Sequence, residues 1–230
     1  MLRHCLLVAA TLLAGAAAAQ PAPRLAPRLA VVELFTSQGC SSCPPADDNV
    51  AALSLRPNVL ALSFGVTYWD RLGWKDTFAQ PAFTQRQVAY ARALHHDAPF
   101  TPQVVVDGRA DVVGNERSEI ERLLRNTPED GPSVNLRSDA VQIGAGAATA
   151  APADVWLVRY DPRTVQVPIR AGENTGRTLP IKNVVKSLTR LGDWRGQAVR
   201  FVLPPASPDL ATAVLVQTKG LGPILAAARG

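Results

Sequence analysis

Cys40 and Cys43 form a C-x-x-C tetrapeptide, a spacing at which two thiols can carry out redox chemistry. A loop that holds this motif and opens into a helix places Cys40 beside unpaired backbone N–H groups and the positive end of the helix dipole, which favour the thiolate. Cys43, one turn further in, is shielded and suited to resolving a mixed disulfide. We therefore expect Cys40 to attack a substrate sulfur and Cys43 to resolve the product.

Thr101 and Pro102 stand at the entry to a predicted strand. A proline at the first position of a strand usually means only that no ladder hydrogen bond is needed there. In a redox fold, a cis proline can instead bring its backbone beside the dithiol, exclude a metal ion, and offer the preceding carbonyl and N–H to an extended substrate. The second interpretation makes Thr101 and Pro102 candidate substrate-binding residues.

Trp69 and Trp74 follow the second predicted strand, near the edge of the sheet where the cysteines are expected. Ligand crevices of open α/β sheets lie at the carboxyl ends of the strands. The two tryptophans are therefore candidates for an apolar rim that binds a peptide substrate. Packing in the core is the equally weighted alternative.

His95 and His96 end a predicted helix shortly before Thr101. Two histidines and two cysteines can in principle form a soft site for copper or zinc. A second C-x-x-C is missing, and adjacent histidines rarely face one ion, so a structural zinc is not indicated. Capping of a helix C-terminus is the ordinary role of a terminal histidine, and we predict neither a metal site nor a cofactor.

The first half of the chain reads as an α/β arrangement. Short apolar runs on either side of Asp107 and Gly108 are a hairpin signal, and two prolines after the C-x-x-C fit only a first helical turn. The order strand, helix, strand, helix, hairpin, helix is typical of a mixed sheet with helices. The predicted elements are strands at Leu29–Phe35 and Val59–Val66, a helix opening at Pro44 and Pro45, a helix over Asp76–His95, a hairpin of Gln103–Val106 with Ala110–Val113, and a helix over Glu116–Asn126.

The second half is rich in short strand candidates separated by Gly and Pro. These candidates are Val134–Ile143, Ala153–Tyr160, Thr164–Ile169, Arg200–Leu203 and Ala213–Gln217, and only Asn183–Leu191 looks helical. We expect a domain over residues 29–130 and a β-rich C-terminal subdomain over 131–230 packed on it. Such a subdomain narrows the choice of substrate if it packs over the dithiol, and serves as a docking surface if it lies at the far edge. The sequence leaves both alternatives open.

Residues 1–20 have the layout of a secretory signal peptide, and 21–28 read as an extended leader. Basic Arg3 is followed by the apolar run Leu6–Leu13 and by small residues that end in an A-x-A site at Ala17–Ala19. An uncleaved anchor is the alternative. Removal of the signal takes Cys5 away, which leaves the C-x-x-C as the only thiols in a periplasmic or secreted protein. No other segment is long and apolar enough to span a membrane.

Composition excludes several classes of protein. The 230 residues are 47% hydrophobic, enough for a normal core, which excludes a disordered or fibrous chain. The formal net charge of +5 is spread out, without a run of five basic residues, so no nucleic-acid partner is indicated.

The arrangement from Val31 to Asn126, with its C-x-x-C, its Thr-Pro before an Asp-Gly hairpin and its closing helix, resembles the thioredoxin fold. The blocks ELFTSQGCSSCPPAD, YWDRLGWKDTFA, FTPQVVVDGRADVVG, ENTGRTLPIKNVVKSLTRLGDWRG and GPILAAA resemble a secreted bacterial thioredoxin-like family known as domain of unknown function 1223. This resemblance implies the fold and a dithiol site, while the substrate of the family is not established.

Two departures from ordinary thioredoxins bear on the direction of electron flow. Gly39 stands where thioredoxins have a tryptophan, and Ser41 and Ser42 replace both the Gly-Pro of reducing thioredoxins and the Pro-His of strong periplasmic oxidants. The resemblance leaves that direction open.

Glu33 is the one charged residue in its apolar strand. Thioredoxins carry a buried acid one strand before the dithiol, and the resemblance implies that Glu33 moves a proton to or from the resolving thiol. Exposure at a strand edge, or pairing with an arginine, is the alternative.

The leading hypothesis is a periplasmic or secreted thiol-disulfide oxidoreductase that acts on protein thiols or disulfides, with a redox partner protein. A copper-binding metallochaperone that uses Cys40 and Cys43 is the second hypothesis. The third is a non-catalytic binding module in which the C-x-x-C is a permanent structural disulfide.

Overall fold

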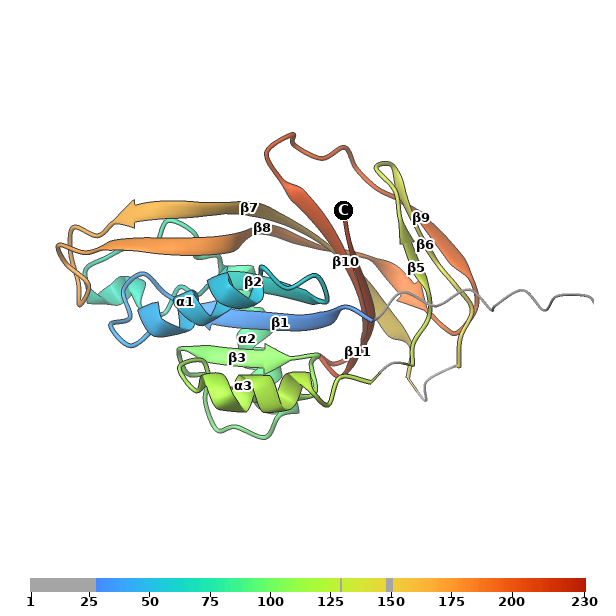
Figure 1. Cartoon of the computed structure of the whole chain (residues 1–230), viewed down its shortest axis with the longest axis horizontal. Helices are drawn as coiled ribbons and strands as arrows, with labels where there is room; N and C mark the ends of the chain where they lie inside the picture. The colour runs from blue at the N-terminus through green and yellow to red at the C-terminus, as the bar shows by residue number, and fades with distance from the viewer. Residues whose placement is uncertain (1–27, 129, 148–150) are drawn as a thin grey trace, which may run out of the picture.

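The structure is a computed structural model that describes residues 28–128, 130–147 and 151–230. The predicted signal peptide and leader residues 21–27 lie outside the described residues. Figure 1 shows the strands and helices of the chain. They are β1 Ala30–Thr36, α1 Pro44–Leu53, β2 Val59–Gly65, the 3₁₀ turn η1 Asp70–Leu72, α2 Pro81–Ala93, β3 Gln103–Val106, β4 Ala110–Val113, α3 Arg117–Leu124, β5 Val134–Leu136, β6 Ala140–Ile143, β7 Ala153–Pro168, β8 Thr178–Trp194, β9 Val199–Val202, β10 Ala211–Thr218 and β11 Ile224–Arg229.

The described strands form two sheets. One is eight-stranded in the order β11-β10-β7-β8-β2-β1-β3-β4, and the other is three-stranded in the order β5-β6-β9. β1 pairs with β2 in parallel and with β3 antiparallel, so the large sheet is mixed. The expected mixed α/β class is therefore confirmed.

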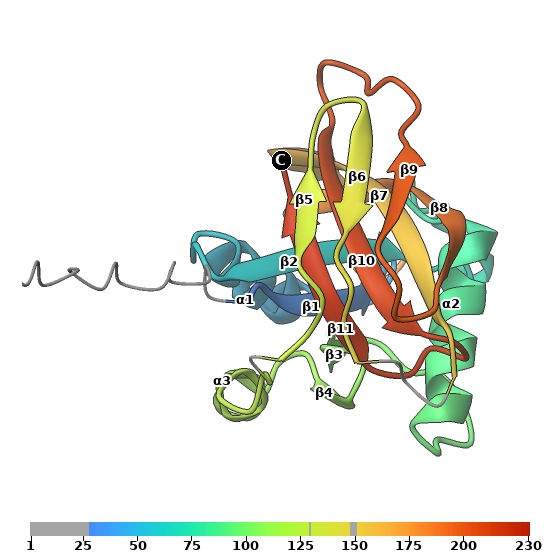
Figure 2. The same ribbon diagram turned by 90° about the vertical axis from the view of Figure 1, so that its right-hand side faces the viewer.

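β1 is buried along its whole length because helices cover both faces of this part of the sheet. Its alternating residues divide between two cores. Val32 and Leu34 pack in one core with residues of α1 and α3, whereas Val31 and Phe35 pack in the other with residues of α2. Figure 2 shows α2 on one side of the sheet and α1 and α3 on the other.

β7 and β8 form a hairpin that runs the length of the molecule (Figure 1). At one end β7 pairs with β10, and together with β10 and β11 it faces the three-stranded sheet across an apolar core that includes Trp194. At the other end the hairpin packs against the segment around Trp74 and Phe78. The loop between β7 and β8, residues 169–177, lies at the same end of the molecule as the start of α1.

The prediction of a helix over Asn183–Leu191 is wrong, because these residues lie within β8. Val184, Val185, Leu188 and Leu191 are spaced like the apolar face of a helix. In the structure the segment pairs with β7, and register shifts in that pairing break the strict two-residue alternation of a strand. Pairing with neighbouring strands overrides the local pattern.

Other boundaries differ in smaller ways. Val134–Ile143 forms two strands, β5 and β6, joined in a hairpin, and the two candidates from Ala153 to Ile169 are joined in the single strand β7. The helix expected from Asp76 begins at Pro81, which occupies its first turn. β11 was not predicted, because its run of alanines resembles no strand pattern.

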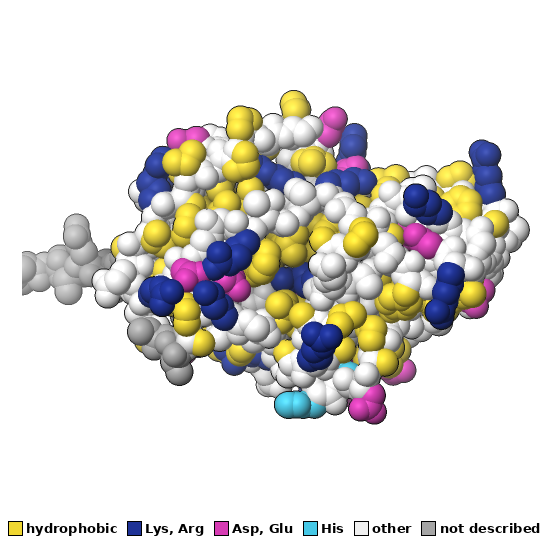
Figure 3. All heavy atoms as spheres, turned by 180° about the vertical axis from the view of Figure 1, so that it is seen from behind, with side chains coloured by type: hydrophobic (Ala, Val, Ile, Leu, Met, Phe, Trp, Pro, Cys, Tyr) yellow, Lys and Arg dark blue, Asp and Glu magenta, His cyan; other side chains and the backbone are white. Residues whose placement is uncertain are grey.

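No helix in the described ranges is long and apolar enough to cross a membrane. Of the described residues on the face shown in Figure 3, the basic side chains stand among apolar and acidic ones and form no continuous basic patch.

Candidate functional site

Cys40 and Cys43 are joined by a disulfide at the start of α1, with their Cα atoms 5.4 Å apart. Cys43 is the residue that precedes the first helical position, and its carbonyl accepts a hydrogen bond from the N–H of Ala46 at 2.9 Å. The N–H of Cys43 donates to the carbonyl of Cys40 at 3.2 Å, which closes a turn. The C-x-x-C therefore stands between a buried strand and a helix, as its sequence context predicts.

Two hydroxyl groups lie next to the sulfur of Cys40. Thr101 Oγ1 is 3.5 Å from Cys40 Sγ, and Ser42 Oγ is 3.3 Å from it. Thr101 Oγ1 also accepts a hydrogen bond from Trp69 Nε1 at 2.8 Å. The Thr101–Pro102 peptide bond is cis, and Pro102 is buried. The fold thus brings Thr101, Pro102 and Trp69 to the disulfide from separate segments of the chain.

The two tryptophans hold the loop that precedes Cys40. A Cβ atom on Gly39 would lie 3.4 Å from Cβ of Trp69, so the side chain of Trp69 begins beside this glycine. Trp74 Nε1 donates to Gln38 Oε1 at 2.9 Å. Both tryptophans are half-buried and also pack against apolar clusters.

Gln38 and Asp76 anchor the same loop, and sequence reasoning missed both. Gln38 is buried, and its backbone N–H donates to Asp76 Oδ2 at 2.8 Å. Asp76 Oδ1 in turn accepts from the backbone N–H of Phe78 at 2.7 Å. Burial raises the pKa of Asp76, and the hydrogen bonds from Gln38, Phe78 and Ala79 oppose that rise. A polar loop residue and an acid far from the motif carry no sequence signal of this pairing.

The C-terminal half reaches the dithiol through the loop between β7 and β8. Asn174 is fully buried, and its Nδ2 donates to the carbonyl of Gln38 at 3.0 Å and to that of Cys40 at 2.9 Å. Glu173 Oε2 accepts a hydrogen bond from the N–H of Ser41 at 3.0 Å. Of the two placements that the sequence left open, the structure has this loop packed on the dithiol loop. Residue type and spacing alone assigned no chemistry to Glu173 or Asn174.

Glu33 is buried and paired with an arginine, the alternative that the sequence left open. Arg86 Nε lies 2.8 Å from Glu33 Oε1, and the Tyr90 hydroxyl and Gln217 complete a buried network. Burial lowers the pKa of Arg86, but the charges of Glu33 and Tyr90 and the hydrogen bonds to both together outweigh it, so that pKa is raised. Glu33 shares its face of β1 with Val31, opposite the face that packs on α1. Its role in proton transfer stays a prediction.

A different acid is buried on the helix that carries the disulfide. Asp47 is 4% exposed, and burial raises its pKa to about 8 against the opposing effect of the Thr36 side chain. It stands four residues after Cys43, so the two side chains lie on the same face of the helix. Asp47 and Asp48 are adjacent residues of the same type, and only the structure distinguishes them, because Asp48 is exposed.

The two histidines have other surroundings. His96 Nε2 lies 3.0 Å from Asp111 Oδ1, and its ring contacts Phe100 edge-on. His95 follows α2 with a left-handed backbone, at φ 64°. Within the described part of the chain, no group of three or more His, Cys, Asp or Glu side chains is placed to hold a metal ion.

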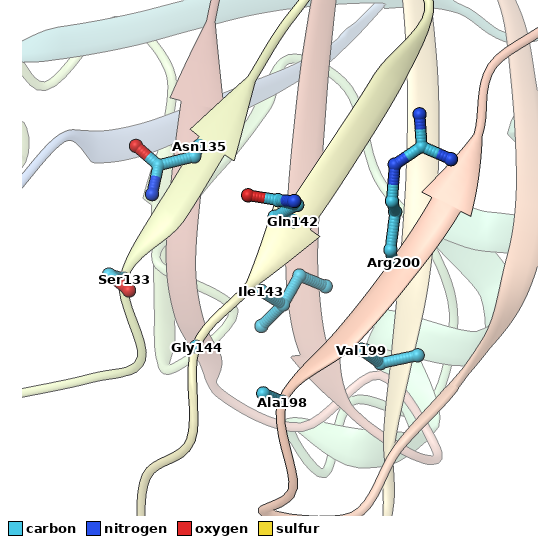
Figure 4. Close-up of a pocket in the computed structure, with 8 residues that line it drawn as sticks. All are labelled: Ser133, Asn135, Gln142, Ile143, Gly144, Ala198, Val199 and Arg200. Carbon is cyan, nitrogen blue, oxygen red and sulfur yellow. The ribbon is translucent and has the colours of Figure 1, made fainter.

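A shallow hollow of about 380 Å³ lies away from the disulfide, on the three-stranded sheet. Figure 4 shows that polar side chains from three neighbouring strands surround it. It contains none of the predicted site residues and is lined by Ser133, Asn135, Gln142, Ile143, Gly144, Ala198, Val199 and Arg200.

Fold and site together define a mixed α/β protein with a C-x-x-C disulfide at the start of a helix and a β-hairpin loop fastened to it. Residues 31–217 match the family model described as "Protein of unknown function (DUF1223)", and the chain belongs to this family. The family resemblance of the sequence blocks is thereby confirmed.

Two solved structures are similar to the chain. One is the X-ray crystal structure of a protein from Agrobacterium tumefaciens, with 34% sequence identity and a TM-score of 0.72 over 87% of this chain and 92% of that one. The other is HBP35 of Porphyromonas gingivalis, with 14% identity and a TM-score of 0.58 over 89% of this chain and 75% of that one. The second likeness concerns the fold alone. A search of curated proteins finds no match.

Proposed function

We propose that the protein is a secreted or periplasmic thiol-disulfide oxidoreductase built on a thioredoxin-like fold, in which Cys40 and Cys43 exchange electrons with protein thiols or disulfides. The observation that carries the proposal is the disulfide at the N-terminus of α1 with two hydroxyl groups beside Cys40 Sγ. Backbone N–H groups at a helix N-terminus and nearby hydroxyl donors stabilise a thiolate, the form of cysteine that reacts.

The reaction of the oxidised protein proceeds in two displacements. A substrate thiolate attacks Cys40 Sγ, a mixed disulfide forms, and the broken bond leaves its electron pair on Cys43, which takes up a proton. A second substrate thiolate then attacks the substrate sulfur of the mixed disulfide and releases Cys40 as a thiolate. The substrate is oxidised to a disulfide and the protein is reduced to the dithiol. The reverse sequence reduces a substrate disulfide.

The residues around the sulfurs have distinct roles in this scheme. Thr101 and Ser42 donate hydrogen bonds to the thiolate of Cys40 as it leaves. Trp69 orients the hydroxyl of Thr101 and, with Trp74 and Pro102, forms the rim along which an extended substrate binds. We assign these substrate-binding roles on the basis of their position around the disulfide.

One observation favours a second candidate function. Both cysteines are 0% exposed, so a substrate reaches Cys40 only after a covering segment moves. A fully covered disulfide is also what a binding module with a permanent structural cross-link would contain. In that case residues 131–230, rather than the dithiol, carry out recognition.

The reduction potential of the pair separates the two candidates. Mature protein is equilibrated in graded redox buffers, and the dithiol fraction is read from the mass added by an alkylating reagent. We expect a potential between about −120 and −270 mV, the range of thiol-disulfide catalysts. A value below about −300 mV identifies a structural disulfide and overturns the proposal.

Trapping of the intermediate gives an independent test of the two cysteine roles. Cys43→Ser lacks the resolving thiol, so it should accumulate a mixed disulfide with protein substrates in a periplasmic extract. Cys40→Ser, its matched control, should accumulate none. Equal trapping by both variants would contradict the assignment of Cys40 as the attacking residue.

N-terminal sequencing of the secreted protein tests the predicted signal cleavage.

A further inference from the structure

The loop between β7 and β8 is held by backbone hydrogen bonds of its own and by contact with Trp74. The N–H of Gly176 donates to the carbonyl of Ile169 at 2.9 Å, and the N–H of Arg177 donates to that of Asn174 at 3.0 Å. Gly172 has a left-handed φ of 77°, and a Cβ atom at that position would lie 3.3 Å from Cβ of Trp74. The loop is thus closed on itself and seated against the body of the protein.

This loop delivers a carboxylate to the peptide unit next to Cys40. Asn174 fixes the position of the hairpin loop relative to the dithiol loop, because its side chain donates to the carbonyls of Gln38 and Cys40, on both sides of Gly39. Glu173, the adjacent residue, then accepts the N–H of Ser41. Hydrogen bonding from Ser41 holds the pKa of Glu173 below its usual range, so this exposed side chain is ionised at neutral pH.

A carboxylate at this place opposes formation of the Cys40 thiolate. The Ser41 N–H is the first donor after Cys40 on the way into α1, and Glu173 occupies it. Reduction of the disulfide creates a second anion, the Cys40 thiolate, close to the Glu173 carboxylate. Two nearby negative charges raise each other's pKa. Because a reduction potential rises when the reduced form is stabilised, a group that destabilises the thiolate lowers it.

We propose that Glu173 is a positioning residue that sets the redox poise of the Cys40–Cys43 pair, lowering its reduction potential from the opposite half of the chain. The inference deepens the proposed function, in that it assigns a control of the same site. In the oxidised protein Glu173 has a hydrogen bond and no anionic neighbour at Cys40. In the reduced protein the thiolate stands on Cys40, the residue before the Ser41 amide that Glu173 binds, so the two negative charges repel each other and the equilibrium shifts toward the disulfide.

The test is Glu173→Gln, which keeps an acceptor oxygen for the Ser41 N–H and removes only the charge. We expect the equilibrium constant to shift roughly threefold to tenfold toward the dithiol, which is about 15 to 30 mV for a two-electron couple. The pKa of Cys40 in the reduced variant, followed by thiolate absorbance against pH, should fall. Glu119→Gln is the matched control, because it removes the same charge from an exposed ion pair with Arg122 on α3 and should change neither quantity.

A second measurement varies the salt concentration and compares the unmodified protein with Glu173→Gln. Because exposed charges are screened by salt, a high salt concentration should raise the potential of the unmodified protein and leave that of Glu173→Gln nearly constant. An unchanged potential in Glu173→Gln, or a shift equal to that of Glu119→Gln, would overturn the inference. Both quantities are measured on the protein alone. A shifted potential without exchange with protein substrates would therefore refute the proposed function and leave the role of Glu173 intact.

Discussion

Neighbouring residues of one type have different roles in this protein, and Asp47 and Asp48 are the clearest pair. They are adjacent in the first turns of α1, yet one is buried on the face of the disulfide and the other faces solvent. A buried carboxyl without a cationic partner holds its proton, because burial penalises the charged form. Asp47 is therefore a largely neutral acid near physiological pH, and its backbone N–H donates to the carbonyl of Cys43 in the disulfide.

The pKa of Asp47 predicts a pH dependence of stability. Burial raises this pKa from 3.8 to about 8, so between these values the folded state binds more protons than the unfolded state. The contribution of Asp47 to the unfolding free energy is then fully present below about pH 4. It falls as pH rises toward 8, by at most about 1.4 kcal/mol per pH unit.

Asp47→Asn should remove that loss, so the variant should be more stable than the unmodified protein at the alkaline end of the window. Urea unfolding of the oxidised protein at a series of pH values measures the effect. Asp48→Asn is the control and should retain the slope. A slope that persists in Asp47→Asn would show that another group is responsible.

At the scale of elements, two buried contacts fix the sheet around the site. The Glu33–Arg86 pair joins β1 to α2 and, through Gln217, to β10. On the opposite face, Gly114 follows β4 where the chain passes close to α1, and a Cβ atom there would lie 2.7 Å from Cβ of Ala46 and 3.2 Å from Cβ of Pro102. The first contact depends on charge and the second on the absence of a side chain.

Arg86→Ala should cost about 3 to 5 kcal/mol of unfolding free energy, because it leaves the buried carboxylate of Glu33 without its cation. The double variant Glu33→Gln with Arg86→Met should lose less, since no buried charge remains. Arg122→Ala, which breaks the exposed pair with Glu119, should cost about 1 kcal/mol or less. Denaturant unfolding compares all three. Equal losses in Arg86→Ala and Arg122→Ala would contradict the argument.

Gly114→Ala should cost about 1 to 3 kcal/mol, because the added methyl group overlaps Ala46 and presses on Pro102. It should also displace Pro102 and Thr101 from Cys40, which changes the rate at which Cys40 is alkylated in the reduced protein. Gly39→Ala places the same methyl group at an ordinary contact distance from Trp69 and should cost about 0.5 kcal/mol or less. A Gly114→Ala protein as stable as Gly39→Ala would refute the close approach.

At the scale of the whole molecule, the apolar core joins the two halves of the chain. The core on the α2 side of β1 contains Phe35 and Phe83 from the first half and Tyr160, Leu215 and Ile224 from the second. β8 also pairs with β2, so the large sheet continues across the predicted boundary at residue 130.

A chain that ends after residue 130 should therefore not fold cooperatively, because it leaves one edge of β2 and this core exposed. Thermal unfolding followed by circular dichroism of residues 29–130, with the full mature chain as control, tests the expectation. A sharp transition in the fragment would show that the first half is an independent domain.

The features that the sequence predicts well are the local ones. Asp107 and Gly108 both have positive φ, as a tight hairpin requires, and the β-branched runs beside them form β3 and β4 as expected. The site as a whole is less predictable, since Asn174 reaches Cys40 across 134 positions of sequence through the register of a long bulged hairpin. No local pattern encodes that register, and the same bulges made part of β8 resemble a helix.

Asn174 and Glu173, at the tip of the β7–β8 hairpin, bind the dithiol loop from a distant part of the sequence. The residues at this tip can therefore be replaced without changing the C-x-x-C itself. The C-x-x-C tetrapeptide and the loop that borders it are encoded far apart, and hydrogen bonds of Glu173 and Asn174 connect them. Grafting other tips onto the hairpin should therefore give a series of proteins that share one C-x-x-C and differ in the residues that border it.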